Sequence, residues 1–387
     1  MPFIVSTSTQ KVDPRTRKLI RSHVMIGKNR GKSRLDGSAD ADGAGERPPR
    51  LLLPPVVPRR VGNDMSLIRV ADETTSAAAL SLIFRFADNA RVGFNPLAAC
   101  IVFNKANKNW MVDMLGWNAA YVNAMVVTTQ SYFHVLGGLD TPVSPHLGRT
   151  LGLLRDRLAD EQVQLSNETI IVVTLLILQA QITGDLIAVR LHTEGVRKMV
   201  HLRGGLGAFM SNSKLAINLI RSDIGLALFS GGKAAFFDNQ DMGNFIPPPF
   251  CLKISPLANP PFVRDLNPQL AGIWRITQGF STQMNLASTT NGRISEPDFV
   301  RSMVSVLYPL QHMDFENGSC DEAIRLALLG YRFDIFLRWR NVLFSFPYLS
   351  VAYERCWMDL RKRDDVPPQL WVWLLTIGGL SVFVPPT

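Results

Sequence analysis

The chain has 387 residues, of which 47% are apolar and 19% charged, so it can bury one large hydrophobic core or two ordinary ones as a soluble globular protein. The formal net charge of +9 is unevenly spread, because residues 1–34 hold nine Lys or Arg and a single acid, Asp13. The high isoelectric point therefore belongs to an N-terminal arm, and it gives no reason to expect a basic surface on the folded body.

The four cysteines, Cys100, Cys251, Cys320 and Cys356, lie far apart and form no Cys-x-x-Cys pair. We expect no sequence-local zinc site, because structural zinc ligands usually come in closely spaced pairs. Lone thiols fit a reducing compartment, and no apolar run follows the start as a secretory signal peptide requires. The sequence thus predicts a protein without metal or cofactor.

The basic arm, residues 1–34, contains a segment with the chemistry of a short helix. Asp13 is placed to cap it, Pro14 suits its first turn, and Gly27 follows its end. A helix this short is marginal in water, so it either orders on a partner or on the folded body, or the whole arm is disordered.

The charges of the arm form two clusters, Arg17-Lys18 and Lys28-Asn-Arg-Gly-Lys32, separated by nine residues. This spacing resembles a two-part nuclear import signal, and the same side chains can contact phosphates. The residues proposed for import or nucleic-acid contact are Arg15, Arg17, Lys18, Arg21, Lys28, Arg30, Lys32 and Arg34. We expect a nuclear protein, with the cytoplasm as the alternative, and weak non-specific DNA contact. No membrane contact is expected, because Leu19, Ile20 and Val24 give too weak an apolar face.

Residues 35–64 are a predicted linker, because glycines and prolines interrupt regular structure throughout them. From 65 to 387 helical periodicity dominates, and no regular alternation of strands and turns appears. A proline-rich interruption near 238–265 is either a long surface loop or an internal boundary between two helical subdomains. The fold class is therefore predicted to be all-α.

Two uncharged runs, Thr169–Ile182 and Leu370–Val384, contain 14 and 15 residues. Both are shorter than the roughly 20 residues that a membrane-spanning helix needs, so we predict buried core helices. Five tryptophans are also expected to pack in the core. These tryptophans are Trp110, Trp117, Trp357, Trp371 and Trp373.

A further helix is predicted after Ser319-Cys-Asp-Glu322, which has the spacing of a capping box. The apolar residues that follow at helical spacing are Ile324, Leu328, Tyr331, Ile335, Trp339 and Val342. They predict a helix of about six turns that packs along one side.

The most informative segment runs from His192 to Leu206 and ends in Arg-Gly-Gly. We predict a helix capped by Asp185 and ended by Gly204-Gly205, with His192, Val196, Met199 and Arg203 on its inner face. His192 is expected to be a hydrogen-bonded core histidine, and Arg203 to interact with the last carbonyls of its helix. Gly195 is placed on the same stripe, where it indicates that another backbone packs close against it.

This segment resembles the fungal-specific transcription factor domain, in which a helix carries a histidine, a glycine, an apolar residue and a terminal Arg-Gly-Gly in this order. The matching residues are His192, Gly195, Met199, Arg203, Gly204 and Gly205. Phe3-Ile-Val-Ser and Arg17-Lys-Leu-Ile-Arg-Ser-His-Val-Met25 look like the opening of a branch without its own zinc cluster. Trp373-Leu-Leu-Thr-Ile-Gly-Gly379 is similar to the last part of the domain.

The resemblance implies a multi-helix regulatory domain that is not an enzyme and acts through protein partners, including a homodimer as one option. The sequence agrees in offering neither a Gly-x-Ser-x-Gly elbow nor a His-Glu-x-x-His pair. Two alternatives remain open. The first is a zinc-cluster activator whose cysteine-rich exon is missing from the gene model, and the second is a helical enzyme or small-molecule-binding protein.

Overall fold

The computed structural model describes residues 70–93, 97–102, 110–139, 144–236, 247–252, 260–290, 292–336 and 346–383. The chain divides between Val61 and Gly62, and every described residue belongs to the second unit. The basic arm, the predicted linker and its continuation to residue 69 lie outside the described residues, as do Trp339 and Val342.

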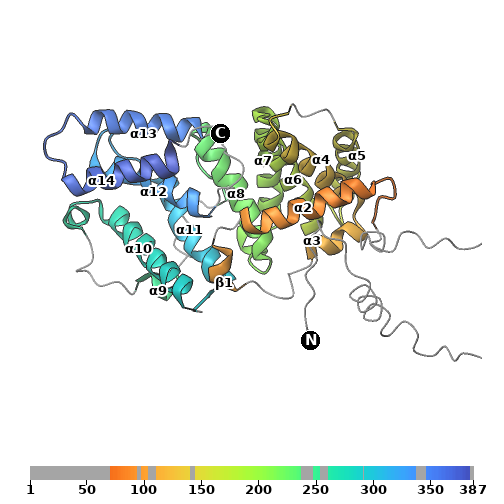
Figure 1. Cartoon of the computed structure of the whole chain (residues 1–387), viewed down its shortest axis with the longest axis horizontal. Coiled ribbons are helices and arrows are strands. Elements are labelled where there is room, and N and C mark those ends of the chain that lie inside the picture. The colour runs from red at the N-terminus through yellow and green to blue at the C-terminus, as the bar shows by residue number, and fades with distance from the viewer. Residues whose placement is uncertain are drawn as a thin grey trace, which may run out of the picture. The chain divides into compact units, whose positions relative to one another are not determined.

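The described residues are mostly helical, which confirms the prediction of an all-α fold. The first helices are α2 (Ala77–Gly93), α3 (Trp110–Asp113), α4 (Ala119–Leu136), α5 (Pro145–Ala159), α6 (Asn167–Thr183) and α7 (Leu186–Leu202). They are followed by α8 (Ser213–Ser230), α9 (Pro249–Leu252), α10 (Pro268–Thr289), α11 (Glu296–His312), α12 (Cys320–Phe336), α13 (Pro347–Leu360) and α14 (Pro368–Ile377). Figure 1 shows the course of these helices.

Short elements complete the described fold. The 3-10 helices are η2 (Ala98–Cys100), η4 (Met114–Gly116), η5 (Leu206–Phe209) and η8 (Pro261–Arg264), and a π-helix, η9 (Gly378–Val382), extends α14. The strands β1 (Ile101–Val102) and β2 (Ile294–Ser295) pair in parallel, with Ile101 opposite Ile294. They join a segment near the start of the fold to the N-terminus of α11.

Helix α6 is the centre of the first group of helices. It packs against α4, α5, α7 and α8, so its side chains are buried nearly all round, including Ile170, Val172 and Leu176. Ser166 caps the helix by accepting from the backbone N–H of Thr169. The prediction of a buried core helix at Thr169–Ile182 is confirmed. Among the described residues, no helix is both long and apolar enough to cross a membrane.

The second group is built around α12, which lies against α11, α13, α14 and η9. Ser319 caps α12 by accepting from the backbone N–H of Glu322 at 3.1 Å. The Glu322 carboxylate binds Arg325 at 2.6 and 2.7 Å, so the predicted capping box has only its first half. The predicted apolar face is present from Ile324 to Ile335, of which Ile324 and Leu328 are fully buried.

Helix α14 differs from the prediction of a buried helix at Leu370–Val384. Leu370 and Leu374 are buried, but Val372 is 66% exposed and Leu375 57% exposed. The prediction was wrong for the outer face because only one side of α14 packs against α12. An uncharged run therefore does not by itself require burial all round.

The tryptophan prediction holds only in part. Trp371 and Trp373 pack against the core, and Trp373 contacts Trp274 with ring centroids 4.7 Å apart. Trp357 is half-buried and meets Trp371 edge to face. Trp117 was predicted wrongly, because it lies just before α4 and is 58% exposed.

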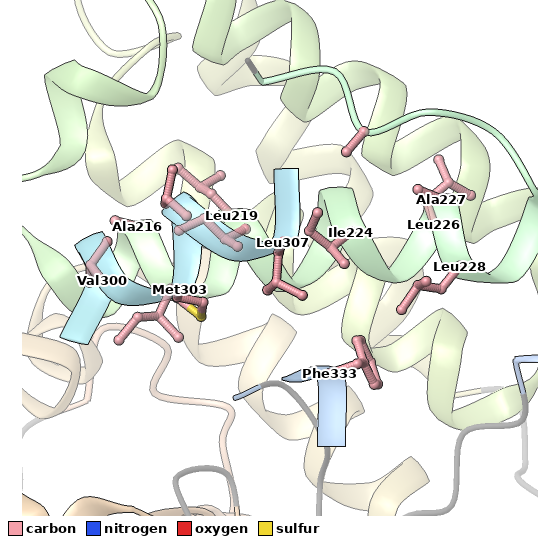
Figure 2. Packing of buried hydrophobic residues seen from close by; sticks show 14 of the residues in the cluster. Ala216, Leu219, Ile224, Leu226, Ala227, Leu228, Val300, Met303, Leu307 and Phe333 are labelled. Carbon is pink, nitrogen blue, oxygen red and sulfur yellow. The ribbon is translucent and has the colours of Figure 1, made fainter. Parts of the chain in front are cut away.

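Helix α8 connects the two groups. It packs against α6 and α7 on one side and against α11 and α13 on the other, and nearly all of its side chains are buried. Figure 2 shows Met303 and Leu307 of α11 against Leu219 and Ile224 of α8. The hydrophobic core is therefore continuous from α4 to α12 through this helix.

Candidate functional site on helix α7

The ends of α7 are set by local signals in its sequence. Asp185 caps the N-terminus by accepting from the Ala188 N–H at 3.0 Å. At the other end Gly204 and Gly205 have φ angles of 91° and 88°, and the Gly205 N–H donates to the Val200 carbonyl at 2.9 Å. These φ values favour glycine, so the predicted cap and stop residues are confirmed.

The inner face of α7 packs against α6 and α8. Its buried residues are Val189, Thr193, Val196, Met199 and Val200. Val196 and Met199 of the sequence motif thus belong to the core, as predicted, and His201 is exposed on the opposite side.

Arg203 ties the end of α7 to the beginning of α6. Its Nη1 donates to the Leu165 carbonyl at 3.0 Å and to Asn167 Oδ1 at 2.7 Å, and its guanidinium lies 4.3 Å from the centre of the Phe209 ring. Leu165 precedes α6, Asn167 is its first residue and Phe209 belongs to η5, whereas the prediction placed the side chain on the last carbonyls of its own helix. The guanidinium reaches across to α6 because hydrogen bonds from a charged donor to well-placed acceptors are stronger than those between neutral groups.

A second arginine of α7, Arg197, joins the helix to α8, and the sequence analysis did not identify it. Its Nε and Nη2 donate to Asp223 Oδ1 at 2.8 and 2.7 Å. Asp223 is fully buried and also accepts from the backbone N–H groups of Ala235 and Phe236 and from the Tyr308 hydroxyl at 2.9 Å. Burial and the adjacent Asp223 charge hold the pKa of Tyr308 well above its usual value, so its hydroxyl stays a donor.

His192 is half-buried, and within the described residues its ring has no hydrogen-bond partner. The prediction of a hydrogen-bonded core histidine was therefore wrong, because the ring lies at the margin between the packed face and the solvent. Burial lowers the pKa of His192, and the Asp185 carboxylate raises it only in part. The neutral ring is the form that the fold favours.

This lowered pKa predicts a loss of stability in acid. The unfolded chain takes up a proton on His192 as the pH falls through about 6.5, whereas the folded chain takes it up only at lower pH, so the free energy of unfolding decreases. We expect His192→Gln to reduce this decrease, measured by urea unfolding at about pH 7 and about pH 5. His201→Gln, at an exposed position of the same helix, is the matched control. An unchanged pH dependence in His192→Gln would contradict the assignment.

Gly195 does not lie where the sequence predicted it. It is exposed, and a Cβ added to it would meet no atom within 4 Å, so no other backbone of the described fold approaches it. The prediction was wrong because Gly195 is three residues after His192, which turns it about 60° away from that residue and toward the outer face.

A glycine in an exposed helix interior costs stability, so Gly195→Ala is expected to raise the free energy of unfolding by about 0.5–1 kcal/mol. Gly205→Ala provides the contrast, because its φ of 88° strains any residue with a Cβ and should cost about 1–3 kcal/mol. Urea unfolding of both variants measures the two changes. A loss of stability in Gly195→Ala in dilute solution would show that another part of the same chain fills the space around this residue.

The outer face of α7 is apolar at several exposed positions. Ile187, Leu191 and Leu202 are 69%, 57% and 59% exposed, and they follow one another at helical spacing on the side opposite Val196. Exposed residues of mixed charge accompany them, namely Arg190, Glu194, Lys198 and His201. We call the set formed by Ile187, Leu191, Gly195, Lys198, Leu202 and Glu194 the outer face.

A polar network that the sequence analysis missed lies between α4 and α5. Asn123 is fully buried in α4; its Nδ2 donates to Asp72 at 2.7 Å, and its Oδ1 is 2.7 Å from His146 Nδ1. Burial alone would raise the pKa of Asp72, but hydrogen bonds from Thr74 and Asn123 lower it below the usual value. The amide nitrogen of Asn123 donates both to Asp72 and to the Ala119 carbonyl, so the network ties the segment before α2 to α4 and α5.

Neither arrangement resembles a metal site. Within the described residues, no three His, Cys, Asp or Glu side chains gather closely enough to hold a metal ion. All four cysteines are free thiols, and Cys100, Cys251 and Cys356 are buried. The residues proposed for import or nucleic-acid contact, Arg15 to Arg34, lie outside the described part of the chain.

Comparison of the chain with protein-family models, with curated proteins and with solved structures finds no match. The assignment of the site therefore rests on its geometry. The structure gives α7 an inner face that packs against α6 and α8, and an exposed outer face on which Ile187, Leu191 and Leu202 are the large apolar residues.

Proposed function

We propose that the chain is a non-catalytic transcriptional regulator of the fungal transcription factor type, which acts through protein partners bound by its helical domain. The observation that supports the proposal is the division of α7 into two faces. Arg197 and Arg203 fix the inner face to α8 and α6, while the outer face presents Ile187, Leu191 and Leu202 to the solvent. Large apolar residues exposed on a rigid element are typical of interaction sites.

In this proposal the basic arm supplies nuclear import and a weak, sequence-independent attraction to DNA. The helical domain supplies specificity for partners. The 387 residues hold no closely spaced cysteines for a zinc cluster, so in this proposal their place at promoters depends on the proteins that they bind. The sequence motif from His192 to Gly205 is a structural signature in this scheme, because its residues set the position of α7.

The test is the location of the fluorescently tagged chain in its native host, beside a version that lacks residues 1–34. We expect nuclear fluorescence that disappears with the arm. A variant with Arg17, Lys18, Lys28, Arg30 and Lys32 changed to alanine controls for the loss of chain length. Cytoplasmic fluorescence in the full chain would overturn the proposal.

A further inference from the structure

We propose that the outer face of α7 is an interface between two copies of this chain, with the two α7 helices antiparallel and crossing near Gly195. This inference deepens the proposed function, because it names one partner of the helical domain. Ile187 and Leu202 mark the two ends of the face, 15 positions apart in the numbering, which is about 22 Å along the helix. Leu191 lies between them.

The pattern of the outer face is self-complementary in the antiparallel direction. With the centre between Glu194 and Gly195, Ile187 of one copy meets Leu202 of the other, and Leu191 meets the aliphatic stem of Lys198. Each contact occurs twice, as an interface between identical surfaces requires. The long lysine stem covers apolar surface while its ammonium group stays at the edge of the contact.

The charges select the same direction. In the antiparallel arrangement Glu194 of one copy lies one helical turn from Lys198 of the other. Two equivalent Glu–Lys ion pairs therefore form, one on each side of the two-fold axis that relates the copies. In a parallel arrangement Glu194 would face Glu194, and Lys198 would face Lys198. Like charges repel, so the antiparallel pair is favoured.

Gly195 explains why the crossing falls at this point. It has no Cβ, and the space above it is open, so the backbone of a second helix can approach closely there. The backbone that the sequence predicted to pack close against Gly195 is thus assigned to a second copy of the chain. The mixed charge of the face also separates it from a membrane-binding helix, in which basic residues flank a wider apolar face.

One helix face covers less than the roughly 800 Å² per partner of a standard interface, so we expect a dimer of micromolar affinity. The test is sedimentation velocity of the full chain between about 1 and about 100 µM at about 0.15 M salt. The wild-type chain should pass from one chain mass to two over this range. A single chain mass throughout would overturn the proposal.

Charge reversal distinguishes this interface from any other. Glu194→Lys and Lys198→Glu should each weaken the dimer at least about tenfold, and the double variant should restore it, because the two pairs form again with opposite signs. Glu354→Lys, at an exposed position of α13, is the matched control and should leave the dimer unchanged. All three positions, Glu194, Lys198 and Glu354, are exposed, and circular dichroism checks that each variant folds.

Single reversals without effect, or a double variant that stays monomeric, would also overturn the interface. The experiment is independent of location in the cell. A chain that dimerises through α7 but stays cytoplasmic would overturn the proposed function alone, and a nuclear monomer would overturn the dimer alone.

Discussion

Asp223→Asn is expected to lower the free energy of unfolding by about 3–5 kcal/mol. The carboxylate accepts from Arg197, from Tyr308 and from the backbone N–H groups of Ala235 and Phe236, and it is fully buried. Asparagine keeps the shape but removes the charge that balances Arg197, and its amide places two donors where only donors surround it. The cost is large because the fully buried donors lose their charged acceptor and Arg197, whose side chain is only 23% exposed, loses its counter-charge.

Urea unfolding followed by circular dichroism measures this cost. Tyr308→Phe, which removes a single hydrogen bond to the same carboxylate, should cost about 1.5 kcal/mol. Asp156→Asn, at an exposed position of α5, should change stability by less than about 0.5 kcal/mol. A loss in Asp223→Asn no larger than that in Tyr308→Phe would mean that the charge of Asp223 contributes little.

Leu307→Ala is expected to cost about 2–5 kcal/mol. Leu307 is completely buried where α11 meets α8, and Figure 2 shows it beside Leu219 and Ile224. Removing the side chain loses its transfer free energy and leaves a cavity between helices that cannot easily close, because α8 is also held by α6 and α7.

The shift of the urea midpoint at constant slope gives the value for Leu307→Ala. Leu151→Ala on α5, where the leucine is 43% exposed, is the control and should cost less than about 1 kcal/mol. Equal losses in the two variants would contradict the placement of α11 against α8.

The elements with local signals could be predicted from the sequence. The caps of α7 were predicted correctly because Asp185, Gly204 and Gly205 act on backbone groups within a few residues. The same holds for Ser319 at the start of α12 and for the uniformly apolar α6. In each case a short segment contains both the group that needs a partner and the residue that supplies it.

The rest depends on contacts between residues distant in the chain. Asp223 is 26 residues from Arg197 and 85 from Tyr308, and no local pattern links them. Asp223 does lie between Ile220 and Ile224 in a largely apolar helix, and this position is a signal for a buried charge. Asn123 and Asp72 are likewise separated by 51 residues. Gly195 was misplaced because an offset of three residues left its face ambiguous at the margin of the helix.

The position of α8 has a consequence for the order in which the amide protons of this fold exchange with solvent. Each group of helices packs apolar surface against α8, so separating either group from α8 exposes that surface to water. The amides of α8 should therefore exchange only through the opening of the whole domain, whereas those of α5 and α14 exchange through local fraying. Cutting the chain after residue 236 would leave α8 with one side uncovered, so neither group of helices is an independent folding unit.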